Sequence, residues 1–252
     1  MRLDAQQFFT EQHSPSHLES ILRRARFDGS IATAQREDEN DGLLALAAQH
    51  AYLKGVIACV DLEHPKLEEV LDACQRCPLF RGVTGRGFLA GPANPPGLRC
   101  LERRGIPLDV VAPAARIPAL LERHPDLSVA MVHLGLPDGS EADDAWFRGM
   151  ERAAQSPKVY VKASGLIAGR GKPWSAAAVR PFVAHALAVF GPRRVMFGSD
   201  WPSCLPDCIW KETLAIFTQA IGAQSMERRE WLLGESARAL YGIEAAGDMT
   251  TA

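Results

Sequence analysis

Residues 55–75, GVIACVDLEHPKLEEVLDACQ, contain the pattern that decides the fold: an apolar run followed at once by an amphipathic segment. The apolar run is flanked by Lys54 and Asp61, and such a continuous run is typical of a strand buried on both faces. Pro65 stands at an expected helix start, where its missing N–H is not needed. This segment therefore predicts a buried strand followed by a helix that ends near Gln75.

The same strand–helix unit repeats along the whole chain. Strands are predicted at residues 2–8, 30–34, 55–62, 79–83, 107–112, 127–133, 159–163 and 195–197. Helices are predicted at residues 17–26, 40–50, 65–75, 97–104, 114–124, 142–154, 175–190, 207–221 and 226–241. An open doubly wound sheet would need a glycine-rich loop after the first strand, which DAQQFFTEQ does not supply. Eight units predict an α/β protein, a single (β/α)8 TIM barrel over residues 1–243, with a flexible C-terminal tail over 244–252.

The composition excludes several classes of protein. Hydrophobic residues make up 47% and charged residues 23%, which is ordinary for a folded domain, and 28 basic against 30 acidic residues give a net charge of −2. Because the charges nearly balance, we expect no nucleic-acid partner and no membrane contact. We expect a cytoplasmic location because the N-terminus lacks a signal peptide. Six cysteines are too few for a disulfide scaffold. The roles of Cys204 and Cys208 stay open, with a Cys204 nucleophile as one alternative, and so does assembly into a homo-oligomer.

Three polar residues stand at the ends of predicted strands, where a barrel carries its chemistry. Asp200, in MFGSDWP (196–202), is expected to act as a base, and the alternative is a cap of the following helix or turn. His133, in SVAMVHLGLP, could polarise a carbonyl, bind a metal or shuttle a proton, and the alternative is a core histidine. Lys162, in VYVKASGL, needs an anion if it is buried, either a substrate carboxylate or Asp200. We take these three residues as the catalytic candidates.

Further residues are expected to contact a substrate. Strand alternation places Tyr160 and Ser164 on the same face as Lys162. Arg86, in TGRGF, could clamp a carboxylate, although a plain surface arginine is the competing interpretation. Trp201 could pack over the barrel mouth or against substrate, and aromatic packing alone would also explain it.

An ordered set of motifs carries a family resemblance: LDAQQFF, CVDLEHP, FRGV, VHLGLP, VYVKASGL, RVMFGSDWP and GESARALYG. The chain resembles the amidohydrolase-related family (amidohydrolase 2) and, within it, the lactonase-like branch, which includes hydrolases of sugar lactones and of 2-pyrone-4,6-dicarboxylate. The resemblance covers nearly the whole chain. It implies a (β/α)8 barrel with a hydrolytic site at its mouth, where Asp200 activates water and His133 assists the scissile carbonyl.

The chain departs from that family at the end of the first strand. The family carries His-x-His there, and the matching positions here are Gln6 and Phe8. Alternation places both side chains on the inner face, with Asp4 below them. Phe8 cannot bind a metal, and a neutral glutamine oxygen is a poor zinc ligand, so His133 and Asp200 alone are too few. We therefore predict no metal and no other cofactor, and assign Gln6 to substrate binding.

Two functional hypotheses follow. In the first, the protein is a metal-independent hydrolase of a lactone or related small cyclic ester, whose substrate carries carboxylate or hydroxyl groups. Asp200 then takes a proton from water while His133, Gln6 or Lys162 stabilises the developing oxyanion. In the second, the barrel has lost hydrolysis and binds a small carboxylate ligand, or catalyses decarboxylation or isomerisation. The sequence names no individual substrate.

Overall fold

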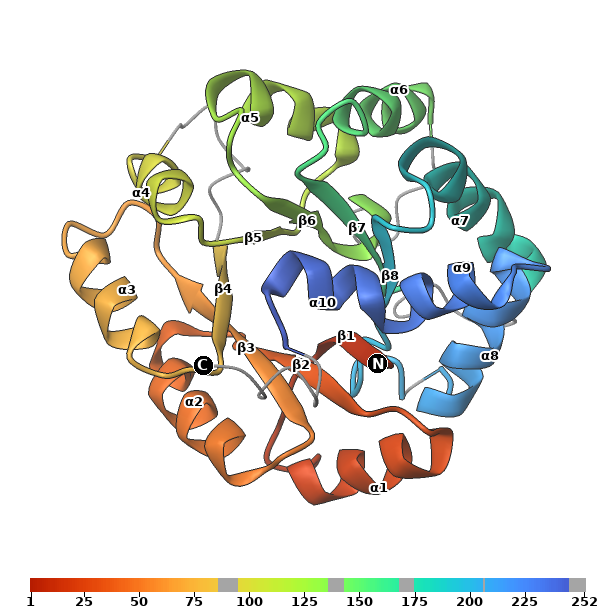
Figure 1. Ribbon diagram of the computed structural model, residues 1–252, viewed down its shortest axis with the longest axis horizontal. Coiled ribbons are helices and arrows are strands. Elements are labelled where there is room, and N and C mark those ends of the chain that lie inside the picture. Colours follow the sequence, from red (N-terminus) through yellow and green to blue (C-terminus); the bar gives the residue numbers. More distant parts are fainter. Residues whose placement is uncertain (86–94, 136–142, 168–174, 206, 245–252) are drawn as a thin grey trace, which may run out of the picture.

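The computed structural model describes residues 1–85, 95–135, 143–167, 175–205 and 207–244, and its centre is a parallel sheet of eight strands in chain order (Figure 1). The strands are β1 (Leu3–Gln7), β2 (Gly29–Thr33), β3 (Leu53–Val60), β4 (Phe80–Gly85), β5 (Leu108–Val110), β6 (Val129–Met131), β7 (Val159–Ala163) and β8 (Val195–Phe197). The predicted (β/α)8 barrel is confirmed.

A ring of helices surrounds the strands (Figure 1). The helices are α1 (Pro15–Ala25), α2 (Asn40–Gln49), α3 (Leu67–Gln75), α4 (Gly97–Arg104), α5 (Ile117–Arg123), α6 (Asp144–Ala153), α7 (Ala176–Phe190), α8 (Trp210–Ile221), α9 (Met226–Glu230) and α10 (Ser236–Tyr241). Short turns of 3₁₀ or π helix are η1 (Glu37–Glu39), η3 (Ala114–Arg116), η4 (Val132–Gly135) and η5 (Trp231–Glu235). None of the helices in the described ranges is both long and apolar enough to cross a membrane.

Apolar side chains fill two layers of the barrel. The larger cluster lies between strands and helices and includes, for example, Leu18 and Leu22 of α1. The smaller cluster lies inside the strands and is formed by Leu3, Ala5, Ile31, Ile57, Ala130, Met196, Ala237, Tyr241 and Ile243. Because strand residues alternate between these two layers, each strand is buried on both faces, as the apolar run near residue 57 predicts.

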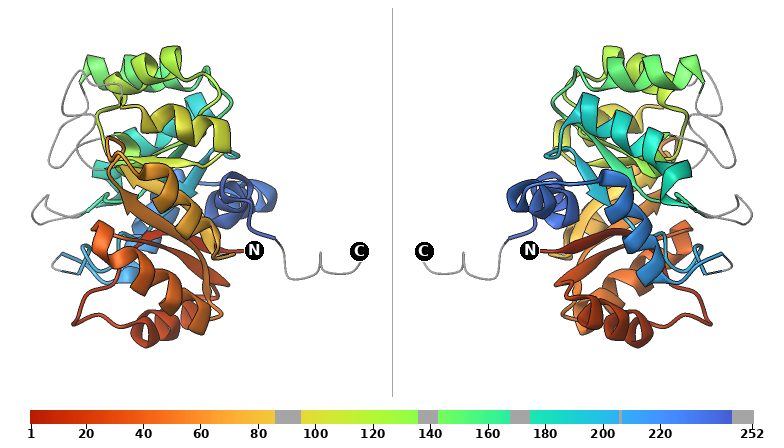
Figure 2. Two further views of the ribbon diagram at one scale, coloured as in Figure 1. Left: turned by 90° about the vertical axis from the view of Figure 1, so that its left-hand side faces the viewer. Right: turned by 90° about the vertical axis from the view of Figure 1, so that its right-hand side faces the viewer.

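Helix α10 covers the end of the barrel at which the strands begin. It lies across the centre of the ring in Figure 1 and on the side of the chain start in Figure 2. Gly234 precedes it and packs so tightly against β1 that an added Cβ would lie 2.1 Å from the Met1 carbonyl oxygen. The helix predicted over 226–241 is therefore divided into α9, η5 and α10, since the backbone at Gly234 is extended. This arrangement leaves the opposite, carboxyl end of the strands for a site.

The last strand joins the first through the residues that follow β8. The Asp200 amide donates to the Gln6 carbonyl oxygen at 2.9 Å, and the Phe8 amide donates to the Trp201 carbonyl oxygen at 3.0 Å. Gln7 and Trp201 form a parallel bridge. The segment that carries Asp200 is therefore also the seam that closes the barrel.

Candidate functional site

The carboxyl ends of β1, β7 and β8 and the turn after β6 bring four of the candidate residues together. Asp200 is bonded to the backbone of Gln6 across the seam. Gln6 and Ser164 both pack against Gly198, since a Cβ added at Gly198 would lie 2.7 Å from Gln6 Cβ and 3.0 Å from Ser164 Cβ. Ser164 in turn contacts His133. These four residues come from distant parts of the sequence and lie at the same end of the barrel.

Both principal candidates sit on left-handed backbone. The φ angle is 57° at Asp200 and 54° at His133, and Leu134 follows with 58°. β6 ends at Met131, two residues before the predicted strand end, because this left-handed turn begins at His133. Strained backbone of this kind is concentrated at functional sites. Helix α8 begins only at Trp210, so Asp200 does not cap it.

His133 is held by Ser164 and by a glycine. Its Nδ1 lies 2.9 Å from Ser164 Oγ, and its backbone N–H donates to the same oxygen at 3.3 Å. Gly165 leaves the space that the ring occupies, since a Cβ there would lie 2.5 Å from His133 Nδ1. Ser164 is only 1% exposed, so the residue orients the imidazole and is badly placed as a nucleophile.

Lys162 has a different partner from either one predicted. Its Nζ donates to Asp109 Oδ2 at 2.5 Å and to Gln6 Oε1 at 2.9 Å, and the side chain is completely buried. The anion is therefore Asp109 and not Asp200, and a contact with a substrate carboxylate stays a prediction. Asp109 lies on the inner face of β5, opposite Lys162, and meets the need for a counter-charge inside the barrel.

Asp109 and Tyr241 join this group of buried polar residues, although neither was predicted from the sequence. The Tyr241 hydroxyl, on α10, donates to Asp109 Oδ1 at 2.6 Å, and its ring centroid lies 5.2 Å from Lys162 Nζ. Burial and the neighbouring Asp109 carboxylate raise the pKa of Tyr241 well above its ordinary value, so the phenol stays protonated and donates. Asp109 could have been predicted from the sequence, because in PLDVV it stands inside an apolar strand just as Lys162 does in VYVKA.

Asp4 does not lie below Gln6 on the inner face. It accepts hydrogen bonds from the Ser199 amide at 2.8 Å and from Trp210 Nε1 at 2.7 Å, on the side of helix α8. The prediction was wrong because the pairing of β1 with β2 shifts between Asp4 and Gln7, and such a bulge interrupts strict alternation. Burial raises the pKa of Asp4, although these hydrogen bonds oppose that shift.

The remaining substrate-binding candidates lie in different places. Tyr160 packs on the inner cluster, two positions nearer the start of β7 than Lys162 and thus farther from the mouth. Arg86 lies outside the described residues. Their roles, like those of Gln6 and Ser164, stay predictions.

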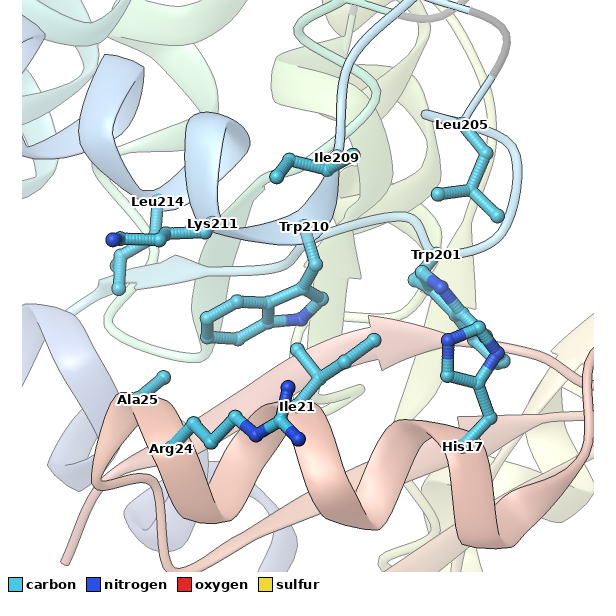
Figure 3. Close-up of a pocket in the computed structure, with 10 residues that line it drawn as sticks. All are labelled: His17, Ile21, Arg24, Ala25, Trp201, Leu205, Ile209, Trp210, Lys211 and Leu214. Atoms are coloured by element: carbon cyan, nitrogen blue, oxygen red, sulfur yellow. The ribbon is translucent and has the colours of Figure 1, made fainter.

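Trp201 is fully buried beside the site. Its ring makes edge contacts with Phe9, His13 and His17, at centroid distances of 6.2, 5.4 and 5.8 Å. Figure 3 shows it with His17 at one end of a groove between α1 and α8, whose volume is about 710 Å³. Aromatic packing accounts for these contacts, and a contact with substrate stays a prediction.

Cys204 and Cys208 are buried free thiols near the seam. Burial raises the pKa of Cys204 to about 12, so this residue is a neutral thiol at ordinary pH and a poor nucleophile. Cys208 Sγ lies 3.1 Å from Thr213 Oγ1. Within the described ranges, no three His, Cys, Asp or Glu side chains converge as a metal site would require.

Comparison with known proteins identifies related chains. A protein of Burkholderia multivorans named L-fucono-1,5-lactonase is 28% identical over an alignment of 266 positions, gaps included, which covers 93% of this chain and 87% of the relative. A protein of the same name from Burkholderia ambifaria is 26% identical over 201 residues, covering 75% of this chain and 69% of the relative. The resemblance to the lactonase-like branch is thereby confirmed.

A solved structure supports the same relationship. The crystal structure of an amidohydrolase from Burkholderia multivorans with bound zinc superimposes with a TM-score of 0.86 at 26% identity, covering 97% of this chain and all of the other. The sequence profile described as Amidohydrolase matches residues 6–243, nearly the whole chain. The expectation of a hydrolase is confirmed at the level of the family. This barrel, with its polar cluster at the mouth, belongs to the Amidohydrolase family.

Proposed function

We propose that the protein hydrolyses a lactone or related small cyclic ester that bears carboxylate or hydroxyl groups, without a metal ion. The observation that carries this proposal is the clustering of Asp200, His133, Ser164 and Gln6 at one end of the barrel. The names of the two lactonase relatives supply the substrate class. A carboxylate and an imidazole at the same end of the barrel suit attack by water on an ester carbonyl.

The reaction is general base catalysis. Asp200 accepts a proton from water as the water oxygen bonds to the lactone carbonyl carbon, and His133 donates a hydrogen bond to the carbonyl oxygen as negative charge develops there. The ring carbon–oxygen bond then breaks, and the proton held by Asp200 passes to the leaving ring oxygen. Ser164, by accepting or donating at Nδ1, fixes the imidazole ring so that Nε2 faces the substrate.

The side chains at the family's metal position do not fit a zinc ion. Phe8 offers no donor atom, and Gln6 Oε1 already accepts a hydrogen bond from the Lys162 ammonium. A zinc ion sharing that oxygen would lie close to a full positive charge and be repelled by it. His133 and Asp200 remain, which is fewer than the three protein ligands of typical catalytic zinc sites. The proposed mechanism therefore uses protein groups alone.

Asp200→Asn tests this proposal. Asn tolerates left-handed backbone, so the fold should survive while the base is lost. On five- and six-membered lactones, including L-fucono-1,5-lactone, we expect kcat to fall by about 10³-fold or more, with the melting temperature within a few degrees of wild type. Asp207→Asn, the same substitution in the same loop, is the control and should keep full activity.

Two results would contradict the proposal. Stoichiometric zinc in active protein, with activity lost to a chelator and restored by zinc, would overturn metal independence. Absence of turnover with every lactone, while a small carboxylate still binds equally to wild type and Asp200→Asn, would favour the binding-protein hypothesis.

A further inference from the structure

We propose that Asp109 and Tyr241 are positioning residues, which act through Lys162 to fix the side-chain amide of Gln6 as a hydrogen-bond donor at the mouth. The four side chains form one buried chain of contacts from α10 to the carboxyl end of β1. As a device for catalysis this inference rests on the proposed function, whereas the fixed orientation of Gln6 does not.

The chemistry of lysine fixes the amide. An ammonium carries three donors and no acceptor, so the Gln6 atom that faces Lys162 Nζ at 2.9 Å is the carbonyl oxygen. The NH₂ group of Gln6 then points away from Lys162, and it makes no hydrogen bond to any described residue. At the place where the family carries a metal-binding histidine, this chain thus presents an N–H donor toward a substrate oxygen.

Asp109 and Tyr241 hold the ammonium in place. One Asp109 oxygen accepts from Lys162, and the other accepts from the Tyr241 hydroxyl at 2.6 Å, so neither carboxylate oxygen is left without a donor. Around them the inner cluster is apolar, with Leu3, Ile57 and Met196 among its members. Filling space does not require an ion pair, because apolar side chains of equal volume stabilise a core as well or better. The polar chain is better explained by the orientation that it imposes on Gln6.

A double-mutant cycle tests whether Tyr241 affects catalysis through Gln6. Tyr241→Phe removes one hydroxyl and no charge, and we expect kcat for lactone hydrolysis to fall about 5- to 10-fold with KM changed less than about 2-fold, as for one weakened hydrogen bond. In a Gln6→Leu background the same substitution should change kcat by less than about 2-fold, because the amide through which it acts is absent. An effect that persists undiminished in that background would mean that Tyr241 is only structural.

Tyr52→Phe is the matched control. Tyr52 is also buried, and its hydroxyl donates to the Pro15 carbonyl oxygen at 2.8 Å, outside the chain of contacts from Tyr241 to Gln6. Tyr52→Phe should lower the melting temperature about as much as Tyr241→Phe does, and it should leave kcat unchanged. A comparable loss of kcat in both variants would overturn the assignment.

A spectroscopic readout separates this inference from the proposed function. In ¹H–¹⁵N spectra the side-chain amide signals of Gln6 are assigned by their loss in Gln6→Leu. We expect Tyr241→Phe to shift them and Tyr52→Phe to leave them in place. Unmoved signals in Tyr241→Phe would overturn the inference whatever the activity. Shifted signals in a protein that hydrolyses no lactone would overturn the proposed function and support the fixed orientation of Gln6.

Discussion

At the scale of the residue, left-handed backbone and neighbouring glycines help to hold His133 and Asp200 in place. Both have positive φ angles, and Gly165 and Gly198 leave the space that the neighbouring side chains occupy. Catalysis by a positioned imidazole is sensitive to displacements of about 1 Å. A change that moves the ring should therefore reduce the rate without removing any functional group.

Gly165→Ala tests this sensitivity. The added Cβ would lie 2.5 Å from His133 Nδ1, so the ring must move, and we expect kcat to fall about 10- to 100-fold. Gly105→Ala is the control, since Gly105 has a similar φ angle of 63° on left-handed backbone but nothing within 4 Å of its Cβ position. Both variants should lose about 1–2 kcal/mol of stability from the left-handed backbone, measured by urea unfolding. Equal kcat in the two variants would show that the position of His133 is unimportant.

At the scale of the element, one buried carboxylate ties β1, the segment after β8 and α8 together. Asp4 accepts from the Ser199 amide and from Trp210 Nε1, and Asp200 follows Ser199 directly. A buried carboxylate that loses a donor is destabilised more than a neutral carbonyl that does so. The contact should therefore contribute more to stability than an ordinary indole hydrogen bond.

Trp210→Phe compared with Trp146→Phe measures that difference. Trp210 donates to the Asp4 carboxylate at 2.7 Å, whereas Trp146 donates to the Leu134 carbonyl oxygen at 2.9 Å, and both indoles are buried. Loss of the bond should contribute about 2 kcal/mol to the destabilisation of Trp210→Phe and about 1 kcal/mol to that of Trp146→Phe. The free energy of unfolding from urea titration gives both values. Equal losses, or a larger one at Trp146, would contradict the role given to Asp4.

At the scale of the whole molecule, closure of the barrel and assembly of the site are the same event. The bonds from Asp200 to Gln6 and from Phe8 to Trp201 join β1 to the segment after β8 and also set the positions of candidate residues. Opening the seam would separate these residues and uncover the inner cluster at once. The predicted single domain over 1–243 should therefore unfold as a unit.

Equilibrium unfolding tests this cooperativity. We expect one transition in urea, with coincident midpoints for far-UV circular dichroism, tryptophan fluorescence and loss of lactonase activity. Wild-type protein is the sample, and calorimetric and van't Hoff enthalpies should agree. An earlier midpoint for activity than for circular dichroism would mean that the seam opens before the barrel unfolds.

The sequence by itself determined the architecture and the positions of the main polar residues. The alternation of apolar runs with amphipathic segments is a local pattern, and it predicts strand–helix units because each must bury its apolar face. Asp200, His133 and Ser164 were found because the carboxyl ends of parallel strands meet at one edge. No knowledge of contacts was needed for either step.

The tertiary structure alone decided which polar groups pair. Lys162 and Asp109 are 53 residues apart and Tyr241 is farther still, so no local pattern joins them. The shift in pairing between β1 and β2 turned Asp4 toward α8 and left Gln6 inside, which strict alternation could not reveal. Hydrophobic periodicity depends only on a few neighbouring residues. Hydrogen-bond partners and side-chain directions depend on strand register and barrel closure, which exist only once distant strands lie side by side.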